Sequence, residues 1–169
     1  MNSTRRMKVG CTVLLFMFLV CCQRASEEPR LMAIPVATID SKVVLREGLI
    51  QALGTERLTK ISYSKPEAGD ITITWAIENN DLRPTTKAAA QNDATTILKI
   101  LKDSKSRFIY VVLIGTISMP DPQGQITETQ VLSLGFNKSK LDKVAWEDFQ
   151  PSDIFNLADV VSVIEEWQE

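Results

Sequence analysis

Residues 71–77 carry the pattern that most restricts how this chain can fold. Ile71, Ile73, Trp75 and Ile77 alternate there with two threonines and an alanine. Successive side chains of a β-strand point to opposite faces, so a period of two predicts a strand with one buried face. The chain therefore has to build a sheet, and other elements have to cover one side of it.

Three further segments complete the predicted sheet. Residues 58–63 predict a strand that forms a hairpin with residues 71–77 through a turn at residues 65–69. The segment 108–117 is apolar on both faces, which is typical of a central strand. The sequence Asp121-Pro122-Gln123-Gly124 suits a type I turn and predicts a second hairpin with residues 127–136.

Helical patterns lie before, between and after these hairpins. A first helix is predicted from Val43 to a stop at Gly54, and a second from Pro84 to about Ser104. Residues 138–144 predict a short helix near a cap at Asn137 or Ser139. Residues 152–167 predict a closing amphipathic helix, with one apolar side made of Ile154, Leu157, Val161 and Ile164.

The order of elements gives the fold class. A helix, two strands, a helix, two strands and a final helix predict an α+β domain with a mostly antiparallel sheet. The helices are expected to pack on one face of this sheet. The length fits a single domain over residues 41–169.

The N-terminal segment 1–22 has the features of an export signal. Arg5, Arg6 and Lys8 precede an apolar run of fourteen residues, from Val9 to Cys22, and polar residues follow. A helix needs about 20 apolar residues to span a bilayer, so this run is short for a spanning helix and typical of a signal peptide. We therefore expect a protein that is exported and lies at a bacterial cell envelope.

The end of this run resembles a lipoprotein signal. In Leu19-Val20-Cys21-Cys22 the leucine lies three residues before a cysteine, although Cys21 stands where the lipoprotein pattern has a small residue. Lipidation at Cys22 would hold the chain on a membrane. Plain cleavage and a short uncleaved anchor remain the alternatives. Residues 23–40 are expected to form a tether, whose second half, 31–39, also fits an edge strand.

Composition excludes several classes of function. The chain has no histidine, and all its cysteines lie at or before Cys22. This rules out internal disulfides in the domain, catalysis that uses histidine, and zinc sites built from histidine or several cysteines. Acidic residues slightly exceed basic ones and the signs are interspersed, so we expect no nucleic-acid binding. No metal and no cofactor is predicted.

A set of short motifs carries a resemblance to a known kind of domain. They are Asn80-Asp81-Leu82, Ile97-Leu98-Lys99, Ile114-Gly115-Thr116, Asp121 with Gly124, Lys140–Val144 with Trp146, and Phe155–Asp159. The chain resembles, over most of residues 43–163, a domain of exported or lipid-anchored bacterial proteins with no established activity. The resemblance implies an α+β domain and no mechanism. It weakens at residues 160–166, where such domains have a stretch containing tryptophan.

Three groups of residues are candidates for a site. Ser62-Tyr63-Ser64-Lys65 matches the S-x-x-K motif of penicillin-recognising enzymes, but these residues end a predicted strand and the companion motifs are missing. Asp148, Asp153 and Asp159 could pair as catalytic or cation-binding carboxylates, against the simpler interpretation of solvated surface groups. Trp146 and Trp167 are candidate partner contacts, with packing as the alternative, whereas Trp75 is expected in the core.

These observations favour one function class over another. The sequence predicts a non-enzymatic module, tethered to a membrane by a lipid or short anchor, that binds an envelope protein partner or takes part in assembly. The alternative is an envelope hydrolase that uses Ser62 with Lys65 or a pair of the aspartates. A pocket that gathers those groups would favour the hydrolase, and an exposed apolar patch near Trp146 or Trp167 would favour the binding module.

Overall fold

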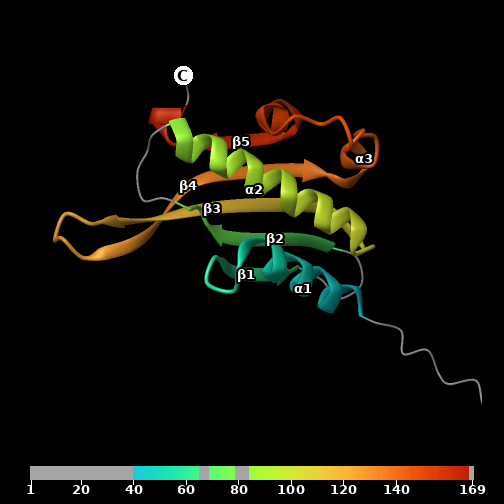
Figure 1. Cartoon of the computed structure of the whole chain (residues 1–169), viewed down its shortest axis with the longest axis horizontal. Coiled ribbons are helices and arrows are strands. Elements are labelled where there is room, and N and C mark those ends of the chain that lie inside the picture. The colour runs from blue at the N-terminus through green and yellow to red at the C-terminus, as the bar shows by residue number, and fades with distance from the viewer. Residues whose placement is uncertain (1–39, 65–68, 79–83, 168–169) are drawn as a thin grey trace, which may run out of the picture. The chain divides into compact units, whose positions relative to one another are not determined.

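The computed structural model describes residues 40–64, 69–78 and 84–167, which form one compact unit with a five-stranded sheet (Figure 1). The strands lie in the sheet in chain order. They are β1 (Leu58–Tyr63), β2 (Gly69–Ala76), β3 (Phe108–Pro120), β4 (Ile126–Asn137) and β5 (Val160–Val163). Only β2 and β3 pair in parallel, and the other neighbours are antiparallel.

Helices pack on one face of this sheet (Figure 1). The two long ones are α1 (Ser41–Leu53) and α2 (Pro84–Asp103), and α2 makes the crossover that the parallel pair β2–β3 requires. The shorter ones are α3 (Lys138–Leu141), η1 (Pro151–Asp153), α4 (Ile154–Leu157) and η2 (Glu165–Trp167). The α+β class with a mostly antiparallel sheet and helices on one face is thus confirmed.

The alternation in residues 71–77 divides the two faces of β2 as predicted. Ile71, Ile73, Trp75 and Ile77 are buried under the helices, while Thr72 and Thr74 on the opposite face are only half-buried. The strand β3 lies in the middle of the sheet and carries Val111 and Leu113 into the same core. Both predicted hairpins, β1–β2 and β3–β4, are present.

Local signals set the limits of α1. The carboxylate of Asp40 accepts a hydrogen bond from the Lys42 amide at 2.9 Å, which caps the first turn. Leu45, Leu49 and Leu53, spaced one turn apart, are its buried residues. Gly54 follows with a φ of 90°, a conformation that suits glycine and ends the helix.

The predicted closing helix 152–167 is wrong. The chain makes η1 and α4, leaves the helix at Ala158 in an extended conformation, and then forms β5 against β4. β-branched valines dominate Val160–Val163, and the open edge of β4 supplies hydrogen-bond partners that a helix would leave unused. Tertiary pairing therefore overrides the helical spacing of the apolar residues.

Other predicted segments agree in part. The helix expected at 138–144 is shorter, at Lys138–Leu141, and its cap residue Asn137 makes no side-chain cap hydrogen bond. The turn at 65–68 and the tether with its predicted edge strand at 31–39 lie outside the described residues. Within the described part of the chain, no helix has the length and apolar character needed to cross a bilayer.

Candidate functional site

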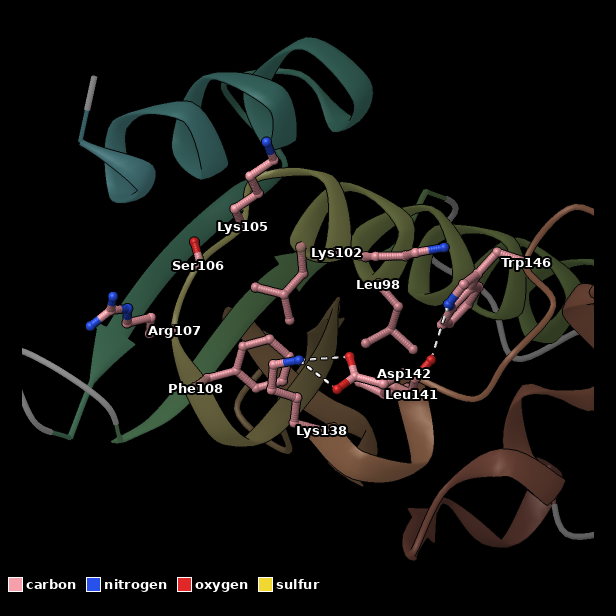
Figure 2. A pocket seen from close by; sticks show the side chains of 11 residues that line it. Leu98, Lys102, Lys105, Ser106, Arg107, Phe108, Lys138, Leu141, Asp142 and Trp146 are labelled. Atoms are coloured by element: carbon pink, nitrogen blue, oxygen red, sulfur yellow. Dashed lines mark hydrogen bonds and ion pairs between the residues drawn. The ribbon is translucent and has the colours of Figure 1, made fainter. Parts of the chain in front are cut away.

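A hollow of about 480 Å³ lies where the end of α2, the start of β3 and the helix α3 meet (Figure 2). Its apolar wall is made of Leu98 and Leu101 from α2, Phe108 from β3, Leu141 from α3, and Trp146. Basic side chains surround this wall: Lys102, Lys105, Arg107 and Lys138. Asp142 is the single carboxylate among the lining residues.

Lys138 and Asp142 neutralise each other. The ammonium of Lys138 lies 2.6 Å from both carboxylate oxygens of Asp142, one helical turn away (Figure 2). It also lies 5.7 Å from the centre of the Phe108 ring, a cation–π distance. Among the described residues, no carboxylate lies within ion-pair distance of the other three cations, Lys102, Lys105 and Arg107. The hollow thus has an excess of positive charge.

The loop that carries Lys105 has an unusual backbone. Lys105 has a φ of 55°, in the left-handed region, and it is the single non-glycine residue with a positive φ in the described part of the chain. A glycine at this place after a helix would avoid the steric cost of about 1 kcal/mol that a side chain meets there. The sequence therefore keeps a cation at a position where backbone energetics alone favour glycine.

Two serines fix this loop to the rest of the domain. The hydroxyl of Ser104 donates to the Leu101 carbonyl at 2.8 Å, and the amide of Ser106 donates to the Ser104 hydroxyl at 3.3 Å. The hydroxyl of Ser106 reaches the carbonyl of Ser41 at the start of α1, also at 3.3 Å. The basic loop is therefore held by buried contacts to both long helices.

A second, more polar hollow of about 280 Å³ lies on the other side of the same loop. It shares Lys105, Ser106 and Arg107 with the first hollow and adds Lys42 from α1. Two carboxylates, Asp40 and Asp70, also line it. The basic side chains therefore continue from α3 across the loop to the beginning of α1.

Trp146 and Trp167 do not have the exposure expected of contact residues. Trp146 is 6% exposed, donates its indole N–H to the Leu141 carbonyl at 3.2 Å, and packs against Phe149. Trp167 is 2% exposed within η2. The prediction of exposed contacts is wrong for both rings because packing against the core removes them from solvent. The expectation that Trp75 is a core residue is confirmed, since it is fully buried.

The three candidate aspartates do not line the main hollows of the described residues. Asp148, Asp153 and Asp159 are absent from the linings of the four best-defined ones. Asp159 accepts hydrogen bonds from the amide of Asn137 at 2.7 Å and from its side chain at 3.0 Å, which fastens β5 to the end of β4. The backbone hydrogen bond lowers the pKa of Asp159 most, helped by Lys140. The described residues contain no cluster of potential metal ligands.

The remaining candidate residues are described only in part. Ser62 lies in β1 opposite Thr72, but its predicted partner Lys65 is outside the described residues. Cys22 also lies outside them.

The sequence analysis did not predict a polar cluster that lies between the sheet and α2. Arg57 forms an ion pair with Asp93 of α2, and its Nε donates to the Ala76 carbonyl at 3.0 Å. The indole N–H of Trp75 donates to the same Asp93 oxygen at 3.2 Å. Burial raises the pKa of Asp93, against the opposing effects of Arg57 and Trp75. The three residues come from separate segments, so no local pattern signals their contact.

No protein-family model, no curated protein and no solved structure matches this chain.

Proposed function

We propose that this protein is an exported, membrane-tethered binding module without enzymatic activity. Its ligand is an anionic group attached to an apolar portion. The observation that carries this proposal is the hollow between α2 and α3, where Lys102, Lys105 and Arg107 lie beside an apolar wall and form no ion pair with any carboxylate of the described residues.

The chemistry of the hollow limits what it can bind. Lysine and arginine donate charge-assisted hydrogen bonds to phosphate and carboxylate oxygens, and these are stronger than neutral ones. Phe108, Leu141 and Trp146 offer an apolar wall that a purely ionic ligand would leave unused. The hollow therefore fits an amphiphile with a phosphate or carboxylate head.

Part of this positive charge also has a structural role. Lys102 and Lys105 lie at the C-terminal end of α2, where cations offset the partial negative charge of the last carbonyl groups. Arg107 and Lys138 lie outside α2, so the helix end does not account for them. The left-handed backbone of Lys105 costs energy that glycine would avoid, and the interaction of its ammonium with the end of α2 offsets part of this cost.

Replacing Lys105 with glycine is expected to stabilise the domain and weaken ligand binding. Relief of the left-handed strain should add about 0.5–1 kcal/mol to the free energy of unfolding. Loss of one charged contact should weaken binding of decyl phosphate about tenfold. The measurements are urea unfolding and NMR titration of the Trp146 indole N–H, on the chain from Gln23 onward.

Decyl glucoside, which has the same chain and no charge, is the control ligand. Decyl glucoside should bind weakly, and its affinity should change little in the Lys105→Gly variant. Equal binding of the two amphiphiles would contradict a charge-selective site. Lys143→Gly is the control variant. Lys143 is exposed and lines neither hollow, so this change tests the loss of a nearby charge alone.

The tether is tested separately at Cys22. Cells that express the full chain are fed a palmitate analogue, and the mature N-terminus is identified by mass spectrometry. We expect a labelled N-terminal cysteine in the natural chain and complete loss of the label in Cys22→Ser. An unlabelled N-terminus at or after Gln23 would contradict lipidation and leave plain cleavage.

A further inference from the structure

We infer that the basic end of the domain, defined by Lys42, Lys102, Lys105, Arg107 and Lys138, docks on the anionic surface of the membrane that holds the chain. The ligands are the phosphate groups of lipid headgroups. This inference rests on the proposed function, because it takes the tether and the amphiphile-binding hollow as given. It adds the identity of the ligand and the orientation of the domain.

The arrangement of the cations fits a surface better than a single small anion. Lys102 and Lys138 lie beside the apolar wall, whereas Lys105 extends toward α1 and Arg107 extends away from the hollow (Figure 2). Lys105 and Arg107 also line the second hollow together with Lys42. Cations that diverge from one point can each meet a different headgroup in the plane of a bilayer, whereas one soluble anion would contact few of them.

Two carboxylates at this end are engaged, whereas the exposed Asp103 at the last position of α2 has no ion pair among the described residues. Asp142 is paired with Lys138, and Asp40 accepts the amide of Lys42 as the cap of α1. Asp70 is the remaining carboxylate of the second hollow, and it forms no ion pair among the described residues. The first hollow, which contains the apolar wall, has Asp142 as its sole lining carboxylate. Repulsion of anionic headgroups is therefore weakest there.

The position of Asp40 links this end to the tether. Asp40, the first described residue, lines the second hollow, and the neighbouring Ser41 is hydrogen-bonded to Ser106 of the basic loop. The segment 23–39 precedes it along the chain. A chain of this length can span at most about 60 Å even when it is fully extended. An anchor at Cys22 would therefore keep the basic end at a high local concentration near the lipid.

Charge differs along the long axis of the domain. The start of α1, the end of α2 and α3 gather at one end, and the tip of the β3–β4 hairpin extends at the other (Figure 1). Residues 108–137, which form this hairpin, contain no lysine or arginine, and they include Asp121 and Glu128. An anionic membrane would attract the basic end and repel the hairpin tip, which selects one orientation.

Lysine accessibility on vesicles tests this inference. The full chain is reconstituted into vesicles of neutral phosphatidylcholine, or of phosphatidylcholine with about one third phosphatidylglycerol. Association is checked by flotation, and acetylation of each lysine by a water-soluble reagent is followed by mass spectrometry. We expect acetylation of Lys102, Lys105 and Lys138 to be about fivefold slower on anionic vesicles, with Lys87 near the opposite end of α2 unchanged.

Charge reversal gives the matched comparison. Lys105→Glu with Arg107→Glu should abolish the protection of Lys102 and Lys138, and Lys87→Glu, near the opposite end of α2, should leave it intact. Equal acetylation on both vesicle types, with the chain floating on each, would overturn the docking while leaving the tether standing. Equal protection on neutral vesicles with added inorganic phosphate would also overturn it, since a soluble anion would then be the ligand. Failure to float on either type would overturn the proposed tether and, with it, the docking.

Discussion

Replacing Asp93 with alanine is expected to lower the free energy of unfolding by about 3 kcal/mol, because it removes the carboxylate that pairs most closely with the partly buried Arg57. The side chains of Arg57 and Asp93 are 24% and 16% exposed, so solvent cannot replace the lost contact fully. The variant also removes the acceptor of the Trp75 indole N–H, which is otherwise satisfied at 3.2 Å. Urea unfolding followed by circular dichroism measures the change.

Two other variants show which part of the interaction matters. Asp93→Asn keeps an acceptor for Trp75 and removes the charge, so its loss should be about half as large. Glu78→Ala is the control, because Glu78 is 76% exposed and its oxygen lies 3.8 Å from Arg57; its effect should stay below about 0.5 kcal/mol. A stability of Asp93→Ala within about 1 kcal/mol of the natural chain would show that desolvation cancels the ion pair.

Adding a methyl group at Gly135 is expected to cost about 2 kcal/mol, because the ring of Tyr110 occupies the space above this glycine. A Cβ at Gly135 would lie 2.8 Å from Cζ and 3.1 Å from Cε1 of Tyr110, closer than carbon atoms normally approach. Tyr110 lies on the sheet face away from the long helices, two residues before Val112, the strand partner of Gly135, so its ring reaches Gly135 diagonally across the β3–β4 pair. The Tyr110 ring covers the backbone of Gly135, which has no side chain of its own to shield it from solvent.

A double-mutant cycle separates this clash from other effects. In Tyr110→Ala the obstacle is gone, so the further change Gly135→Ala should cost less than about 0.5 kcal/mol. Ser133→Ala, at a half-buried position on the same strand, should have a small effect and serves as the control. Additive losses from Tyr110→Ala and Gly135→Ala in urea unfolding would contradict the predicted contact.

The strands could be predicted from the sequence because local pattern and burial agree. The period of two in residues 71–77 reports which side chains face the helices, and the apolar run from Phe108 marks the strand in the middle of the sheet. The helices cover one face of this strand, and on the other face Ile109 is exposed and Val112 is half-buried. The prediction of a helix at the end of the chain is wrong because the local pattern and the tertiary structure disagree there. Ile154, Leu157, Val161 and Ile164 have helical spacing, but Val161 belongs to β5 and pairs with Leu134. These residues form a strand because the free edge of β4 offers hydrogen-bond partners, and a local sequence pattern gives no information about that edge.

The candidate site could not be predicted for a similar reason. Its cations come from α2, the loop that follows it, and α3, and each one alone has the pattern of an ordinary surface residue. Only the crossover through α2 and the hairpin β3–β4 bring Lys102 near Lys138. Trp146 was selected for its loop position, and it does line the hollow, but as a buried wall and not as an exposed contact.

The order of the strands has a consequence for how the protein reaches its folded state. The strands lie side by side in the order in which they are synthesised, even though β2 and β3 run parallel. When such a chain emerges N-terminus first from a ribosome or an export channel, every new strand finds its neighbour already outside. No strand has to insert between two strands that are already paired. The sheet can therefore grow by addition at one edge, and β5 is the last strand to join.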